Sequence, residues 1–584
     1  MHAKRQGTLY SWQFWAYAVL FVGFAAGSVS LLSTPIDDAF ISFRYLDNWL
    51  RGQGLVFNPG ERVEGYSNFL WIAILAIPSL FGAAPYLASP EIEWFLALGC
   101  LGLLAVGARK AADLPNGMHL FAPVLLALNS AFFFWIGKGM EVVFYTTLQI
   151  ALAVVILVCR THRVEDHSAA SPKTGWKPVL RGTLSLRDAL LMGLIAAAAA
   201  LTRPEGAVAP AIVLGALAVA DRDRRKNYLL ALVILAAAVA GQFIFRLLYY
   251  GPLWPNTYYA KRLPTNLAIA AGLRYLRKFL VGSSEQAAWF YASGWASHLP
   301  IWVVCAAAWV FAAKQWRKLW PATLQMVSLV AVAIYVGGDW MPAFRFFVPA
   351  IPLGCLLVAA GLSEMAHASE VRGERQEVGE EREAASLLRW RRLLAHGLLV
   401  ILVMVEGVAL VDMIRSHEFG RWRHHIHNYG PMAAWLKGNA REGSLVALSD
   451  IGIISYYNPK LRFIDVLGLT DPHIAALSGI HHLKTDVDYV LRSEPDYVLV
   501  MFFEWPEIKK TLPKTAFDAM FLKHVAEKND YEGVAEVFGW KEGLWGERHV
   551  WFDVYARKTT TGQSELFGVQ ALACWLRSKI QPES

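Results

Sequence analysis

Long apolar runs alternate with short charged clusters over the first 413 residues, and this alternation constrains the fold more than any other feature. A helix that crosses a membrane needs roughly 20 mostly apolar residues. Charged residues are scarce, at 17% of the chain, whereas a soluble domain has about 25%. The pattern predicts an α-helical polytopic membrane protein. Its transmembrane helices, about 11, are expected at residues 12–33, 92–109, 118–137, 142–159, 188–202, 206–220, 228–249, 299–313, 319–336, 346–363 and 393–413.

The first apolar run is too long for a cleaved signal peptide. Residues 12–33 exceed a hydrophobic signal region of roughly 7–15 residues, so we expect an uncleaved first span. The net charge of +8 does not indicate nucleic acid, because the basic residues gather in short loops between spans, where orientation requires them. The 5 cysteines form no CxxC motif and are interpreted as small buried hydrophobes.

A twelfth apolar run, residues 68–83, decides the orientation. With the N-terminus in the cytoplasm and this run not crossing, every basic cluster between spans falls in the cytoplasm, as the positive-inside rule requires. If the run crossed, the same clusters would lie outside. We therefore expect residues 68–83 to form a re-entrant or interfacial helix on the outer side. The clusters are Arg109–Lys110, 160–187, Arg222–Lys226, Lys314–Lys318 and 366–392, the last read as a solvated helix or linker.

The same topology places the segments with unusual polar residues outside the membrane. They are residues 34–91, 138–141, 203–205, 250–298, 337–345 and everything after about 414. The expected domains are a transmembrane module, residues 1–413, with outer loops 34–91 and 250–298, and an outer domain, residues 414–584.

The segment 414–584 has the composition of a soluble domain. Short strand-like runs alternate in it with helical stretches, which predicts a small extracytoplasmic α/β domain. The strands are expected at 444–448, 463–466, 497–502 and 549–555, and helices at 431–438 and 485–492.

Two adjacent carboxylates, Asp37 and Asp38, follow the first span. A carboxylate at a membrane edge beside apolar surface is partly desolvated, which raises its pKa and suits a general base. The structural alternative is that Asp38 caps the helix that follows it. An adjacent pair also fits one base beside one cap or metal ligand, and the sequence leaves these roles open.

Other outer loops carry charges that have both a structural and a functional interpretation. Glu61, Arg62 and Glu64 either form an ion-pair network or bind sugar hydroxyls. Glu141 is either a second acid of the site or the partner of Lys138. The two interpretations require different distances between these side chains, and a sequence does not give those distances.

Two further loops join spans and hold one acid and one arginine each. Arg203 and Glu205 connect two short apolar runs, where charges are costly unless they pair or line a wet cavity. Asp339 and Arg345 lie in an apolar setting, where they either pair with each other or leave Arg345 to bind a phosphate.

Lys261 and Arg262 end an aromatic stretch, residues 249–259. Cations beside aromatic rings suit a lipid-linked phosphate, and they equally suit an ordinary interfacial belt. All of these polar groups are expected on one side of the membrane, and this convergence is the strongest functional indication.

The same stretches resemble GT-C fold glycosyltransferases, and more narrowly the mycobacterial terminal β-(1→2) arabinofuranosyltransferase family. The matching segments are DDAFISFRY (37–45), GLVFNPGERVEGYSNFLW (54–71), GKGMEVVFY (137–145), LTRPEG (201–206), YYGPLWPNTYYAKR (249–262), GGDWMPAFRF (337–346) and SDIGIISYY…FIDVLGLTDPHIA (449–475). The GGD stretch continues differently from the mycobacterial enzymes, which leaves the donor sugar open, arabinofuranose included.

The resemblance implies an inverting transfer of a sugar from a polyprenyl-phosphate donor to a cell-envelope glycan, lipid or protein, with Asp37 or Asp38 as the catalytic base. Membrane lipids are expected as further partners, and nucleic acid is not. The acidic residues allow a divalent metal but do not specify one. The location implied is a bacterial cytoplasmic (inner) membrane, with the site on the periplasmic side. Donor-binding candidates are Arg44, Arg203, Glu205, Asn256, Tyr258, Tyr259, Lys261, Arg262, Asp339 and Arg345, and acceptor-binding candidates are Glu61, Glu64, Tyr66 and Glu141.

Two other functions compete with a transferase. A flippase for a lipid-linked sugar is expected to show repeat symmetry and charges at the membrane midplane, whereas the charges here gather at one face. A non-catalytic scaffold that binds glycan through residues 414–584 is indifferent to loss of Asp37 or Asp38.

Overall fold

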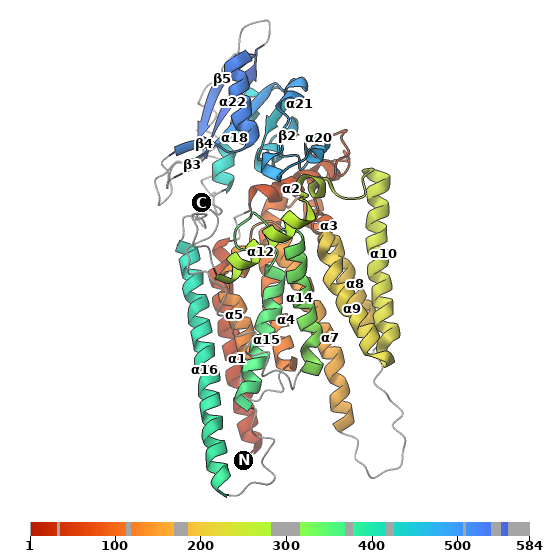
Figure 1. Ribbon diagram of the computed structural model, residues 1–584, viewed down its shortest axis with the longest axis vertical. Helices are drawn as coiled ribbons and strands as arrows, with labels where there is room; N and C mark the ends of the chain where they lie inside the picture. The colour runs from red at the N-terminus through yellow and green to blue at the C-terminus, as the bar shows by residue number, and fades with distance from the viewer. Residues whose placement is uncertain are drawn as a thin grey trace.

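The computed structural model describes most of the chain, in ten stretches. The described residues are 2–31, 35–111, 118–168, 185–281, 316–367, 378–415, 425–505, 510–528, 530–538 and 550–558. They form a bundle of long helices with a sheet-containing domain at one end (Figure 1).

The bundle contains helices at the predicted apolar runs that fall within the described residues. They are α1 (His2–Ser28), α4 (Pro85–Ala111), α5 (Phe121–Leu128), α6 (Ser130–Phe134), α7 (Val142–Ser168), α8 (Leu186–Thr202), α9 (Val208–Ala220), α10 (Arg225–Tyr249), α14 (Trp316–Tyr335), α15 (Ile351–His367) and α16 (Val378–Arg415). Within the described residues, 6 helical stretches are long and apolar enough to cross a membrane. The chain is therefore a multi-pass membrane protein. The number of about 11 spans stays a prediction, since the run 299–313 lies outside the described residues.

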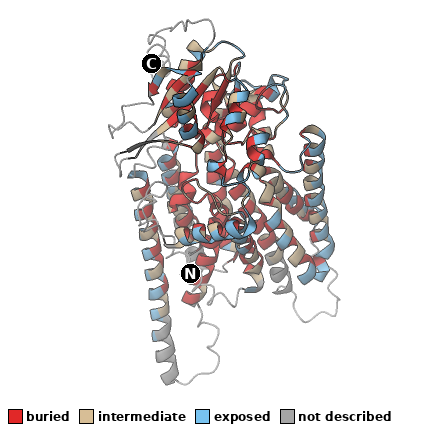
Figure 2. Ribbon diagram, turned by 45° about the horizontal axis from the view of Figure 1, so that its top comes forward, coloured by how far each residue is buried: buried red, intermediate tan, exposed pale blue. Residues whose placement is uncertain are grey.

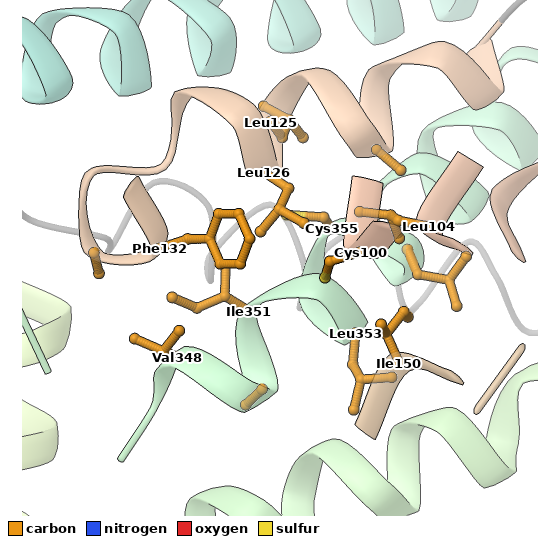
Figure 3. Close-up of a cluster of buried hydrophobic side chains, with 14 of the residues drawn as sticks. Cys100, Leu104, Leu125, Leu126, Phe132, Ile150, Val348, Ile351, Leu353 and Cys355 are labelled. Atoms are coloured by element: carbon orange, nitrogen blue, oxygen red, sulfur yellow. The ribbon is translucent and has the colours of Figure 1, made fainter. Parts of the chain in front are cut away.

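Helix α15 forms the centre of the bundle, because 94% of its apolar stretch is buried. Small and branched side chains of α4, α7 and α15 interlock there, with Cys100, Ile150 and Cys355 in one cluster (Figure 3). Outer helices such as α10 are mostly exposed along their apolar faces (Figure 2). Exposed leucine and valine on such helices fit contact with lipid chains.

The run 118–137 differs from its prediction as a single span. It breaks at Asn129, whose backbone is extended (φ −68°, ψ 116°) and separates α5 from α6. The Asn129 side chain accepts a hydrogen bond from the Phe132 amide at 3.0 Å, and its Nδ2 donates to Glu406 of α16 at 3.0 Å. A polar side chain that satisfies a helix end thus interrupts an otherwise apolar run.

The run 68–83 forms only the short helix α3 (Phe69–Leu80), of 12 residues. At 1.5 Å per residue this helix is about 18 Å long, too short for a hydrocarbon layer of about 30 Å. It lies near the sheet-bearing end of the bundle (Figure 1). This length is consistent with a segment that does not cross.

Two further helices belong to this end of the bundle. Helix α11 (Asn256–Lys261) and helix α12 (Thr265–Val281) follow α10. Helix α12 crosses in front of the bundle (Figure 1) and packs on α14, where Gly272 is so close that a Cβ would lie 2.0 Å from the Ile334 carbonyl oxygen.

The sheet has the strand order β2-β1-β3-β6-β5, with β4 beside β3. Strands β1 (Leu445–Leu448), β2 (Arg462–Asp465) and β3 (Tyr497–Trp505) are parallel, and β4 (Lys510–Pro513), β5 (Tyr531–Phe538) and β6 (Val550–Arg557) join through antiparallel pairs. Helices α18 (His425–Asn439), α19 (Gly452–Tyr456), α20 (Pro472–Ala476), α21 (Val487–Arg492) and α22 (Ala516–Lys528) complete it. All four predicted strands and both predicted helices are present. Strands β4 and β5 and helices α19, α20 and α22 were not predicted; β4 is short, and β5 carries a bulge at Gly533–Ala535.

One face of the sheet packs against the bundle, and the side chains of the central strands alternate between this face and the opposite one. Leu499 and Met501 of β3 belong to a core that also contains Phe40 and Trp71, from the first loop region, whereas Val498 and Val500 face the other side of the sheet. Because side chains alternate between faces of a strand, one face of the sheet domain packs on α2 (Asp37–Leu50) and α3. Helix α2 lies at this junction (Figure 1).

Candidate active site

Asp37 joins the first loop to the sheet domain. Its Oδ2 accepts a hydrogen bond from the Gly452 amide at 3.0 Å, its Oδ1 accepts one from the Ile453 amide at 2.7 Å, and its own amide donates to His425 Nδ1 at 3.1 Å. A Cβ on Gly452 would lie 1.9 Å from the Asp37 carbonyl oxygen, so only glycine permits this approach. Asp37 is buried, and its two oxygens are occupied.

Arg44, two helical turns later on α2, binds the other end of α19. Its guanidinium donates to the Leu461 carbonyl at 2.9 Å, to the Asn458 carbonyl at 3.3 Å and to the Ser455 carbonyl. It also donates to the Phe57 carbonyl at 2.8 Å and is buried. The structure shows a structural role for Arg44: four of its five N–H donors bind backbone carbonyls. Its expected role in donor binding stays a prediction.

Asp38 differs from Asp37 in being available. It is half-buried and makes no hydrogen bond with any residue that the structure describes. Burial raises its pKa, and the charges of Lys261 and Arg345 oppose that increase. Ile36, without a side-chain hydrogen bond, occupies the N-cap position of α2. The interpretation of Asp38 as the helix cap is thus wrong, because α2 begins one residue before it.

A third carboxylate, Asp450, comes from the sheet domain. Its Oδ2 accepts a hydrogen bond from the Tyr429 hydroxyl at 2.6 Å and forms an ion pair with Lys514. Burial raises the pKa of Asp37 to about 8, and the Asp450 charge adds to the increase against the opposing amide of Ile453. Burial alone would raise the pKa of Asp450, but the Lys514 ammonium brings it below the usual carboxyl value.

Cations approach Asp38 from the bundle. Arg345 pairs with Asp339 at 2.6 Å, with its guanidinium carbon 5.6 Å from the Phe346 ring centroid. Lys261 is exposed and forms no hydrogen bond or ion pair with a described residue, although surrounding protein desolvates it and lowers its pKa, as does the Arg345 charge. Both charges are close enough to Asp38 to influence it.

The loop that carries Arg345 is strained. Ala343 and Phe344 adopt φ angles of 52° and 50°, a region that costs a non-glycine residue on the order of 1 kcal/mol or more. Helix α12 holds the loop in place, because the Tyr275 ring stacks on Phe347 at 4.9 Å between centroids. The surrounding structure therefore fixes the position of Arg345.

A buried ion-pair network lies beside the cations. Arg203 donates to Glu141 at 2.7 Å and to Glu205 at 2.5 Å, and Asn68 donates to the second Glu141 oxygen at 3.0 Å. The expected Arg203–Glu205 pair is present, and the partner of Glu141 is Arg203 in place of Lys138. Arg203, Glu205 and Arg345 line one pocket with Tyr145, Phe346 and apolar residues of α14.

Comparisons with known proteins identify the architecture that carries this site. Residues 417–556 match a family described as a domain of unknown function, DUF8728. A terminal β-(1→2)-arabinofuranosyltransferase of Mycobacterium tuberculosis is 30% identical over 241 residues, covering 38% of this chain and 34% of the relative. The Corynebacterium glutamicum protein of that name is 28% identical over 251 residues, covering 42% and 35%. The match thus spans about a third of these relatives.

Two solved structures align over nearly the whole chain. ArnT from Cupriavidus metallidurans, bound to undecaprenyl phosphate, has a TM-score of 0.55 at 13% identity and covers 94% of this chain and 99% of its own. The Archaeoglobus fulgidus oligosaccharyltransferase has a TM-score of 0.54 at 12% identity, covering 91% and 80%. The chain has the GT-C fold.

Several predicted site residues hold this GT-C structure together. The buried Glu64 binds Arg246 of α10 at 2.8 Å, and Glu61 binds Arg462 of β2 at 2.5 Å. Asn256 donates to the carbonyls of Gly468 and Leu469, at 2.9 and 3.0 Å. The Glu61 and Asn256 contacts join loops of the bundle to the sheet domain and so dock the domain, whereas the Glu64–Arg246 pair holds the first loop on α10.

The remaining candidates are three tyrosines in contact with other aromatic side chains and the exposed Arg262. Tyr66 is buried and accepts a hydrogen bond from the Tyr250 hydroxyl at 3.1 Å. Tyr258 is exposed and packs against Trp254 and Tyr259, with ring centroids 5.4 and 5.6 Å away. Arg262 is exposed beside Lys261.

The described residues around the site do not indicate a metal ion. Among the residues that the structure describes, no group of 3 or more His, Cys, Asp or Glu side chains is arranged to hold an ion. No step proposed below uses a metal.

Sequence reasoning missed the contribution of the sheet domain to the site. His425 accepts a hydrogen bond from the Asp37 amide. Tyr429 and Lys514 both bind Asp450, the third carboxylate of the site. The segment 449–475, which resembles the transferase family, contains Asp450 and was the available signal.

Proposed function

We propose that this protein is an inverting glycosyltransferase, which moves a sugar from a polyprenyl-phosphate donor to an acceptor hydroxyl. The observation that carries the proposal is Asp38: a carboxylate with no hydrogen bond to a described residue, beside Lys261 and Arg345. A free base next to cations fits both requirements of an inverting transfer, deprotonation of the acceptor and stabilisation of a departing phosphate.

The reaction needs no covalent enzyme intermediate. The acceptor hydroxyl gives its proton to Asp38, and its oxygen forms a bond to the anomeric carbon. The bond from that carbon to the phosphate oxygen breaks, and both electrons leave with the polyprenyl phosphate. Lys261 and Arg345 balance the negative charge on the leaving group. Inversion at the anomeric carbon follows from this single displacement.

We assign different roles to Asp37 and Asp38. Asp37 is a positioning residue because both of its oxygens bind amides of α19. Asp38 is the base because its carboxylate remains available. Arg203, Glu205 and Glu141 support the donor pocket through their mutual pairs.

We further propose the sidedness expected from the charge distribution. Residues 1–413 would form the membrane module and residues 414–584 the domain outside a bacterial cytoplasmic membrane, with the site at their junction. The names of the partially matching relatives favour arabinofuranose as the first donor sugar to test.

The test is a transfer assay with the full chain in lipid nanodiscs. Farnesyl-phosphoryl arabinofuranose serves as donor and an octyl arabinofuranoside disaccharide as acceptor, followed by farnesyl-phosphoryl donors of other sugars. Wild-type protein should form a new glycosidic bond detected by mass spectrometry, and Asp38→Asn should lose about 10²–10⁴-fold in rate. Glu442→Gln, in an exposed ion pair with Lys460, is the matched control. Full activity of Asp38→Asn would exclude Asp38 as the base, and lack of product from every donor would contradict the proposed transfer.

A further inference from the structure

The position of Asp450 leads to an inference about the acceptor. Asp450 follows strand β1 and lies two residues before the start of α19, the helix that Asp37 and Arg44 hold on α2. Gly452, two residues after Asp450, donates its amide to Asp37 at 3.0 Å, and Asp37 directly precedes Asp38 on α2. The sheet domain therefore places a carboxylate beside the proposed base, and two strong contacts fix its location.

Asp450 is oriented but not saturated. The Tyr429 hydroxyl and the Lys514 ammonium both bind Oδ2, and among the described residues none donates a hydrogen bond to Oδ1. The Asp450 and Lys514 side chains are 14% and 17% exposed. An ionised carboxylate only accepts hydrogen bonds, so its open oxygen suits a hydroxyl donor.

The charges around Asp38 separate two sides of the site. Lys261 and Arg345, which suit a phosphate, come from the bundle, as does Asp339, the partner of Arg345. Asp450 and its partner Lys514 come from the sheet domain. The open Oδ1 of Asp450 accepts a hydrogen bond from a hydroxyl, which an ionised phosphate cannot donate. In an inverting displacement the acceptor approaches on the face away from the leaving phosphate.

We propose that Asp450, oriented by Lys514 and Tyr429, binds a ring hydroxyl of the acceptor sugar and places the neighbouring hydroxyl at Asp38. This inference rests on the proposed glycosyl transfer and specifies its acceptor as the hydroxyl-bearing end of a neutral glycan. The sheet domain is then a part of the active site and supplies an acceptor-binding residue. Lys514 is a positioning residue that acts through Asp450.

The experiment compares acceptors and variants in the same nanodisc assay. The probes are the octyl arabinofuranoside disaccharide and its analogues that lack one terminal-ring hydroxyl each. In the wild type, one analogue should raise the acceptor KM about tenfold or more. Asp450→Asn should raise the KM of the parent acceptor similarly, leave the donor KM within about twofold, and abolish the penalty of that analogue. Such a cycle isolates the contact between one hydroxyl and one side chain.

Two further variants separate binding from folding. Asp450→Glu should recover part of the acceptor affinity, and Lys514→Met should raise the acceptor KM less than Asp450→Asn. Glu442→Gln, in an exposed pair on the same domain, should match the wild type. Because the cycle compares two acceptors on one variant, a change in the amount of folded protein cancels.

The outcomes distinguish this inference from the proposed function. If the wild type transfers sugar while Asp450→Asn changes the donor KM alone, changes neither KM, or keeps the full analogue penalty, Asp450 does not bind the acceptor. The transferase proposal survives that result. If the wild type forms no product from any donor, the proposed function fails first, and this inference fails with it.

Discussion

Asp37 and Arg44 stand two turns apart on α2 and bind opposite ends of α19. Asp37 accepts hydrogen bonds from the first amides of α19, and Arg44 donates to the carbonyls at and beyond its end. A carboxyl group that accepts from the amide end and a guanidinium that donates to the carbonyl end both satisfy polar groups that the helix leaves unpaired. One helix of the first loop thereby fixes the sheet domain on the bundle.

Gly452→Ala tests how tightly this junction is packed. The added methyl carbon would lie 1.9 Å from the Asp37 carbonyl oxygen, so the domain must shift or α2 must distort. Overpacking of this kind costs about 1–3 kcal/mol, and the thermal unfolding midpoint should fall by several degrees. Gly438→Ala is the control, since nothing lies within 4 Å of its added carbon. An equal midpoint for both variants would contradict the packing.

Arg44→Met separates a structural role from a phosphate-binding role. The substitution leaves the carbonyls of Ser455 and Leu461 without their donor, at a cost of roughly 2–4 kcal/mol. We expect a lower unfolding midpoint and faster limited proteolysis of the sheet domain. In the fraction that stays folded, the donor KM should be unchanged. A large rise in donor KM at wild-type stability would instead assign Arg44 to the donor.

The pH profile of transfer reports on Asp38. A base must be ionised to act, and burial raises the Asp38 pKa, so the acidic limb of kcat/KM should lie above the ordinary aspartate value of about 4. The Lys261 charge lowers the pKa of Asp38. Lys261→Met should therefore move this limb to higher pH. Movement to lower pH, or none, would contradict the proximity of the two groups.

The topology of the chain is testable with reporter fusions. One alkaline phosphatase or green fluorescent protein reporter is fused after Ser67 and another after Arg109. These two sites lie on either side of α3 and most of α4. Because α3 is too short to cross and α4 is long enough, the two fusion sites should lie in opposite compartments. Reporters on the same side would overturn the proposed orientation and, with it, the outer location of the site.

The sequence alone determined the class of this protein. Hydropathy and charge patterns are local, and a bilayer imposes the same length and charge rules on every span. They predicted a polytopic helical protein, and residues 444–448 and 497–502 read correctly as strands of a second domain. The aspartate pair and the family resemblance directed attention to the first loop before any contact was known.

Only the tertiary structure separated Asp37 from Asp38, placed Arg44 at the domain junction, and added Asp450. The first two of these decisions depend on hydrogen bonds between residues some four hundred positions apart. The third depends on the contacts of Asp450 with Tyr429 and Lys514 within the sheet domain. Adjacent residues on a helix point in different directions. The docking position of the sheet domain therefore decides which of the two aspartates forms hydrogen bonds with α19. That docking follows from long-range packing of the sheet on α2, which no local pattern encodes.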